Sequence, residues 1–168
     1  MTSQVLSGPP VHAVTGSSSP TETGQSHSTL LARDHGEHTR KIPGRARQWA
    51  LDHADALGYG PTSTLVDNLE LIVAELVTNA VKYAQGPVHL TLSRECSGEL
   101  RLVVRDNHAT EKSTPAMVLH DSTEAADKTH GRGLWIVQQL STSWGVERSG
   151  TGHLVWSRPS PKPPEEPW

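Results

Sequence analysis

The chain has 168 residues, a formal net charge of −3 and a single cysteine, Cys96. This length predicts one domain with tails, the lack of a basic excess argues against direct nucleic-acid binding, and one cysteine excludes an intramolecular disulfide and fits a reducing compartment. No apolar run approaches the roughly 18–20 residues of a membrane span, and the first residues lack a secretory signal pattern, so we expect a cytoplasmic protein without membrane contact.

Composition predicts an extended tail at each end of the sequence. Residues 1–28 are rich in Ser, Thr, Gly and Pro and have no periodicity, which is typical of a disordered segment. The segment from Pro159 to Trp168 contains five prolines and two glutamates, which predicts a second extended tail. We therefore place one folded domain at residues 29–158.

Two helices are predicted in the first half of this domain. Pro43 is expected to open the first helix, Trp49 to pack in the core, and Gly58 to end the helix. The second is expected to start near Pro61 and to be helical over residues 65–84. Its apolar residues fall on one broad arc, opposite a narrow polar stripe that consists of Asn68, Glu75, Asn79 and Lys82.

The second half of the domain predicts two hairpins separated by a loop and a helix. Alternating apolar residues predict strands over 88–92 and 100–104, joined by a turn at Ser97-Gly98. About 24 residues without periodicity follow, then a helix opened by glycines, then a hairpin over 144–157. The order predicts an α/β two-layer sandwich, with a mainly antiparallel mixed sheet and helices on one face.

Glu75 and Asn79 are the first candidate functional residues. They are four positions apart on the long helix, which places their side chains about 5–6 Å apart on one face. A carboxylate beside a carboxamide could hold a hydrated Mg²⁺ and activate a hydroxyl. The alternative is an ordinary solvated stripe, because this spacing is common by chance.

Asp106 and the segment Gly131-Arg132-Gly133 are the other candidates. Asp106 ends a predicted central strand, where its carboxylate would either start a turn or accept a hydrogen bond from the exocyclic amine of adenine. The glycines at a helix start would let the main chain approach a phosphate, or would only serve the turn. The segment lacks the Gly-Lys-Ser/Thr of a Walker loop, and His35-x-x-His38 lacks the further ligands of a metal site.

Taken in order, these motifs resemble the nucleotide-binding boxes of the GHKL ATPases. Within that superfamily the chain resembles the histidine-kinase-like ATPase domain of the bacterial RsbW-type anti-sigma factor serine/threonine kinases. The resemblance extends over roughly residues 30–157. The segments that carry it are Ala74-Glu75-Leu76-Val77-Thr78-Asn79-Ala80-Val81-Lys82-Tyr83-Ala84, Val104-Arg105-Asp106 and Gly131-Arg132-Gly133-Leu134-Trp135-Ile136-Val137.

The resemblance implies a Bergerat-type sandwich and a role for each matching residue. Asn79 would coordinate Mg²⁺, Glu75 would be the general base, and Asp106 would bind the adenine amine. The loop over 107–130 would close as a lid over ATP. The phosphates would be wrapped by the segment of Gly131, Arg132, Gly133 and Leu134, with Lys82 near them.

The resemblance also implies an activity and partners. The protein would phosphorylate a serine or threonine of an antagonist protein, sequester a sigma factor, or do both, and it could form a homodimer. The sequence departs from the family pattern at His108 after the adenine-binding aspartate, and at His153 and Leu154 before the final Val-Trp. These departures favour an alternative, a non-catalytic protein-binding module that responds to ATP.

Overall fold

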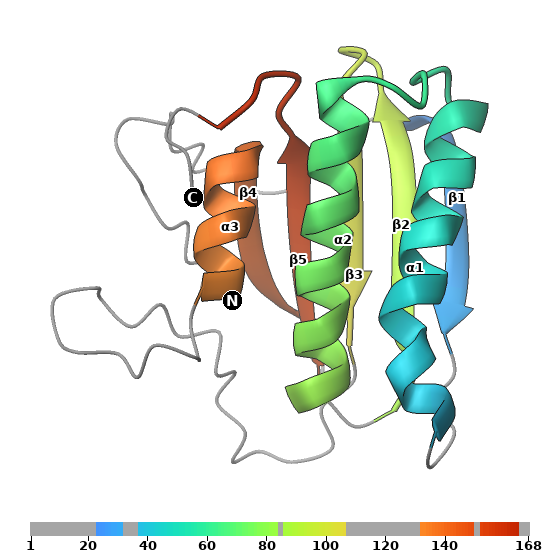
Figure 1. Cartoon of the computed structure of the whole chain (residues 1–168), viewed down its shortest axis with the longest axis vertical. Coiled ribbons are helices and arrows are strands. Elements are labelled where there is room, and N and C mark those ends of the chain that lie inside the picture. Colours follow the sequence, from blue (N-terminus) through green and yellow to red (C-terminus); the bar gives the residue numbers. More distant parts are fainter. Residues whose placement is uncertain (1–22, 32–36, 84–85, 107–131, 150–151, 165–168) are drawn as a thin grey trace, which may run out of the picture.

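The computed structural model describes residues 23–31, 37–83, 86–106, 132–149 and 152–164 of the chain (Figure 1). Three helices lie side by side over one face of a five-stranded sheet, and none of the described helices lies on the other face (Figure 1). The elements in chain order are β1 (Thr23–Leu31), α1 (Glu37–Ala56), α2 (Thr64–Tyr83), β2 (Val88–Glu95), β3 (Leu100–Arg105), α3 (Arg132–Leu140), β4 (Ser141–Ser149) and β5 (Gly152–Pro159).

The sheet has the strand order β1-β2-β3-β5-β4, and every pair of neighbouring strands is antiparallel. The two predicted hairpins are confirmed as β2–β3 and β4–β5. The predicted fold class, a two-layer α/β sandwich with helices on one face, is therefore confirmed, and the sheet is antiparallel throughout the part that the structure describes.

The core lies between the helices and the sheet. Alternate residues of β2 and β3 point toward the helices because strand side chains alternate between faces, and Leu90, Leu92 and Leu102 are fully buried there. The apolar arc of α2 packs onto them with Leu69, Ile72, Val73, Leu76 and Val77, all at most 1% exposed. Helix α2 begins as predicted, and the hydroxyl of Ser63 caps it by accepting from the N–H of Val66 at 3.3 Å.

The predicted N-terminal tail is wrong over its last residues. Strand β1 begins at Thr23 and pairs with β2 from Thr23 opposite Glu95 to Leu31 opposite Val88. The composition of β1 is polar because it is an edge strand, so its order comes from main-chain pairing with β2 and from the burial of Leu31. Residues 1–22 lie outside the described residues.

The predicted start of the first helix is also wrong. Helix α1 begins at Glu37, and Pro43 lies inside it. Proline removes one hydrogen bond of the helix, but Ile42 and Ala46 on either side are buried against the core, so packing overrides the local preference. The end is as predicted, since Gly58 adopts a left-handed φ of 89°. Trp49 is half-buried against the core, stacked on His53.

The predicted C-terminal tail is wrong over its first residues. Pro159 is the last residue of β5, and the N–H of Ser160 donates to the carbonyl of Leu140 at 2.7 Å. The side-chain amide of Asn68 donates to the carbonyls of Ser160 and Lys162, each at 2.9 Å. Asn68 was expected on the polar stripe, but it is buried and ties this segment to α2. Residues 165–168 lie outside the described residues.

Candidate functional site

Gly133 lies directly against the pair formed by Glu75 and Asn79. A Cβ atom built on Gly133 would lie 2.7 Å from Oε2 of Glu75 and 3.3 Å from Nδ2 of Asn79. The first distance is shorter than real Cβ atoms tolerate, so a larger residue at position 133 would require the side chains of Glu75 and Asn79 to move from these positions. The structure thus brings three of the predicted site residues together from two distant segments of the sequence.

The start of α3 is fixed by its apolar side. Leu134, Val137 and Leu140 are buried in the core, which holds the helix beside α2. The first turn of a helix has N–H groups that are not used within it and carries the positive end of the helix dipole. Because Gly133 is in that first turn, the carboxylate of Glu75 lies next to a locally positive region that would also attract phosphate.

Asp106 follows β3 directly and is buried. Its N–H donates to the carbonyl of His153 at 3.0 Å, and its Oδ1 accepts from the N–H of His153 at 2.9 Å. The first bond extends the ladder between β3 and β5 by one residue, and the second fixes the carboxylate. The ring Nδ1 of the buried His153 lies 3.6 Å from the same Oδ1.

The three parts of the candidate site lie at one end of the molecule. Figure 1 shows the C-terminal end of α2, the end of β3 and the start of α3 at the same edge of the sandwich. The chain enters the segment 107–131 from β3 and leaves it into α3, so that segment connects two parts of the site. Its residues, including His108 and Gly131, lie outside the described residues, as does the side chain of Arg132.

This arrangement agrees with a family comparison. The model of the histidine kinase-like ATPase domain matches residues 25–158. The chain belongs to this family. A comparison with curated proteins finds no match. The chain therefore contains an ATP-binding domain of the histidine kinase-like class. The matched region includes residues 25–31 of β1, of which residues 25–28 belong to the tail that composition predicts.

The side chains of Glu75 and Asn79 have the kinds of oxygen atom that bind Mg²⁺ in a magnesium–nucleotide site. A carboxylate and an amide oxygen are hard ligands, and Mg²⁺ usually takes only one or two protein ligands together with phosphates and water. No group of three or more His, Cys, Asp or Glu that could hold a metal occurs among the described residues.

Two further residues of the predicted phosphate site, Lys82 and Leu134, differ in exposure. Lys82 is exposed in the last turn of α2. Leu134 is 8% exposed and belongs to the core, so its only group able to meet a phosphate is its main-chain N–H.

The two departures on β5 differ in consequence. His153 is buried beside Asp106, and that contact was not foreseen because it depends on the register between β3 and β5. Leu154 alternates with the buried His153 and Val155, so its side chain belongs to the open face of the sheet.

No helix in the described ranges is both long enough and apolar enough to span a lipid bilayer.

Proposed function

We propose that this protein is an ATP-dependent serine/threonine protein kinase of the anti-sigma factor type. The observation that carries the proposal is the contact of Gly133 with Glu75 and Asn79. This contact places a carboxylate, a carboxamide and the positive end of α3 around one point. A carboxylate on an isolated polar stripe would have no reacting group beside it. A carboxylate beside a helix start that attracts phosphate would lie near a bound phosphoryl group.

The family resemblance and the contact at Gly133 support one role for each residue. Asn79 would ligate Mg²⁺ through Oδ1, and the ion would neutralise phosphate charge. The main chain at Gly133 and Leu134 would bind phosphate oxygens through N–H groups. Asp106 has one carboxylate oxygen taken by His153, and its other oxygen would accept from the adenine amine.

Glu75 would act as the general base. Its carboxylate is half-buried and next to the start of α3, so it would accept the proton of a serine or threonine hydroxyl as that oxygen attacks the γ-phosphate. The bond between the γ-phosphorus and the β–γ bridging oxygen would break, and ADP would leave. Most of the rate enhancement would come from positioning and from charge stabilisation by main-chain N–H groups. The hydroxyl would belong to an antagonist protein, a sigma factor would be the second partner, and the protein could act as a homodimer.

Nucleotide binding is tested first, with Gly133→Ala. The methyl group would push Glu75 and Asn79 away from α3, so we expect at least a tenfold loss of Mg-ATP affinity in calorimetry. Gly44→Ala is the matched control, because nothing lies within 4 Å of its Cβ position in α1. Equal affinity of the two variants would contradict the site.

Phosphate transfer is tested separately. The chain is used to capture partners from a bacterial lysate, and the captured proteins are incubated with γ-labelled ATP and Mg²⁺. We expect label on a serine or threonine of one partner, and a loss of at least a hundredfold in Glu75→Gln with ATP affinity within a few fold of wild type. Transfer by Glu75→Gln at the wild-type rate would exclude Glu75 as the base.

A second function, a non-catalytic ATP-responsive binding module, is favoured by one observation. Asp106 already accepts the main-chain N–H of His153 and has an imidazole 3.6 Å from the same oxygen, which would weaken its hold on adenine. ATP binding and partner capture without any label transfer would select this function over the kinase.

A further inference from the structure

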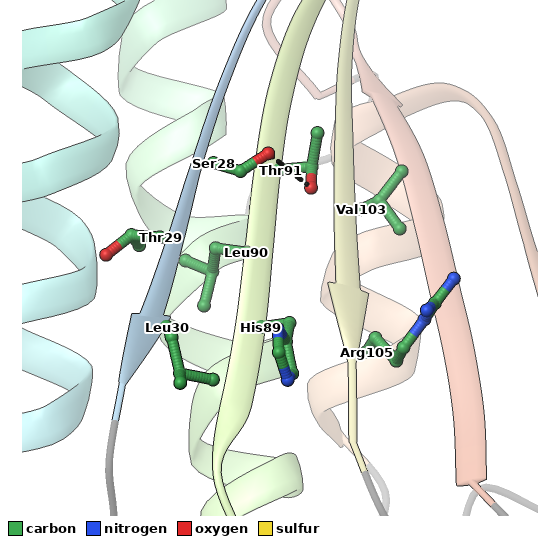
Figure 2. Close-up of a pocket in the computed structure, with 8 residues that line it drawn as sticks. All are labelled: Ser28, Thr29, Leu30, His89, Leu90, Thr91, Val103 and Arg105. Atoms are coloured by element: carbon green, nitrogen blue, oxygen red, sulfur yellow. Dashed lines mark hydrogen bonds between the residues drawn. The ribbon is translucent and has the colours of Figure 1, made fainter.

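The open face of the sheet has a regular arrangement of side chains in rows. The strand register places Leu30, His89, Arg105 and Leu154 in one row across four strands. The neighbouring row consists of Ser28, Thr91, Val103 and Trp156. An open pocket of about 400 Å³ lies over these rows on β1, β2 and β3, and Figure 2 shows the side chains that line it.

We call the part formed by Ser28, Leu30, His89, Thr91, Val103 and Arg105 the open-face cradle. Its floor is ordered, because the hydroxyls of Ser28 and Thr91 are hydrogen-bonded at 3.1 Å (Figure 2). Leu30 and Val103 give it apolar walls, and Leu30 is 52% exposed, one of three large apolar residues that the described chain exposes. An ordered, partly apolar surface of this kind is suited to contact with another chain.

The basic groups of the cradle have no carboxylate partner among the described residues. His89 and Arg105 are directly opposite each other on neighbouring strands, which brings two basic groups together on one face. In the part of the chain that the structure describes, no carboxylate lies within ion-pair distance of either. Figure 2 shows the Arg105 side chain extending away from His89 toward β5. A carboxylate would interact favourably with both groups once the Arg105 side chain turns toward His89.

Elsewhere on the open face, two arginines are paired with a carboxylate. Arg158 makes two hydrogen bonds to Glu95, at 2.7 and 3.0 Å, and Arg101 lies 3.8 Å from the same carboxylate. Among the described residues of the open face, the basic side chains that lack a carboxylate partner are therefore those of the cradle, His89 and Arg105.

We propose that the open-face cradle binds the acidic segment Glu165-Glu166-Pro167-Trp168 of a second copy of the chain. One or both glutamates would lie between His89 and Arg105, and the indole of Trp168 would pack on Leu30 and Val103. The prolines around the glutamates favour an extended backbone, which can lie along the face without losing much conformational freedom.

The described residues before this segment are held away from the cradle of the same chain. Ser160 and Lys162 are bonded to α2, and Ser160 also to the end of α3, on the helix side of the sheet. Arg105 pairs with Leu154, five residues before Pro159, so the cradle lies about 17 Å from Pro159 along β5 and on the opposite face. A stretch of four residues extends at most about 14 Å. This geometry favours binding between two molecules.

Fluorescence anisotropy with a labelled synthetic peptide of residues 159–168 tests the proposal on the full chain. We expect saturable binding that weakens at least tenfold in Arg105→Glu and at least tenfold with a peptide carrying Glu165→Gln and Glu166→Gln. Arg45→Glu, an exposed arginine on α1, serves as the matched control and should bind like wild type. Circular dichroism checks that all variants are folded.

A charge exchange makes the test decisive. Arg105→Glu should bind a peptide with Glu165→Lys and Glu166→Lys more tightly than the native peptide. Sedimentation should show self-association of the full chain at low salt that Arg105→Glu removes. No binding at millimolar peptide, wild-type affinity in Arg105→Glu, or equal affinity for a scrambled peptide of the same composition would each overturn the proposal. Mg-ATP binding is measured in parallel and should not change.

Discussion

The helix-covered face of the sheet carries Leu90, Leu92 and Leu102, all fully buried, whereas the open face carries Arg101 and Arg158 around Trp156. Each guanidinium carbon lies 5.3 Å from the centroid of the indole ring, a cation–π distance. Hydrogen bonding to Glu95 raises the pKa of Arg158, so this cation persists at any ordinary pH.

The two faces of the sheet contribute to the protein in different ways. Apolar burial on the helix side supplies most of the stability, because stability scales with the apolar area removed from water. Charge pairing on the open face contributes less, but it keeps the surface rigid and in contact with solvent. Substitutions matched across the two faces can test this division of labour.

The largest effect is expected for Leu92→Ala. It leaves a cavity under α2 and should lower the free energy of unfolding by about 3 kcal/mol. Val103→Ala, half-buried on the open face, should cost less than about 1 kcal/mol. Guanidinium denaturation measures both, and equal losses would contradict the comparison.

Glu95→Gln tests whether the open face depends on its carboxylate. Glu95 is 6% exposed and serves both arginines, so removing its charge should cost about 2 kcal/mol. Glu70→Gln is the control, because its pair with Arg47 is exposed and should contribute well under about 1 kcal/mol. If Glu95→Gln lowers the free energy of unfolding no more than the control does, the ion pairs of Glu95 do not contribute to stability.

Gly145→Ala probes the packing of Trp156. A Cβ at Gly145 would lie 2.9 Å from three atoms of the indole, so the ring must shift, at a cost of about 1–2 kcal/mol. Gly60→Ala has nothing within 4 Å of the added atom and should be nearly neutral. Thermal denaturation and the change in tryptophan fluorescence report the result, and an unchanged emission spectrum would argue against displacement of the ring.

The smallest change in the free energy of unfolding is expected for a substitution of Tyr59, which lies between the helices and the sheet. Its hydroxyl donates to the carbonyl of Gly98 at 2.7 Å, and burial raises the pKa of Tyr59 above 10.0. The unfolded chain then loses this proton first as pH rises, so stability should fall above about pH 10.

Tyr59→Phe should cost about 0.5 kcal/mol at neutral pH, because the hydrogen bond is exposed. It should also make the alkaline loss of stability shallower. Urea denaturation between pH 8 and pH 11 compares the two proteins, and parallel curves would exclude Tyr59 as the titrating group.

Local periodicity was sufficient to predict most of the fold. Helix α2 and the hairpins β2–β3 and β4–β5 were predicted because their apolar patterns and turns are local. Strand β1 was missed because an edge strand made of Ser, Thr and Gly has no local pattern, and Pro43 was misplaced because packing of Ile42 determines the start of α1.

The candidate site was predictable in its residue types but not in its contacts. Four-residue spacing placed Glu75 and Asn79 together, while the approach of Gly133 depends on the packing of α3 against α2. The contact between Asp106 and His153 depends on strand register, and the carbonyls bound by Asn68 are 92 and 94 positions away. Such long-range contacts leave no signal in a single sequence.

The position of β1 in the sheet has a consequence for the order of folding. The strands of each hairpin are adjacent in sequence and can pair early, but both α1 and α2 separate β1 from β2. The pairing of β1 with β2 therefore needs a long loop to close, and β1 also lies at the edge of the sheet, so we expect it to open more readily than the central strands. Its amides should exchange with solvent before those of β3, and each opening removes Ser28 and Leu30 from the cradle. Local unfolding of one edge strand therefore controls how often the open face can engage a second molecule.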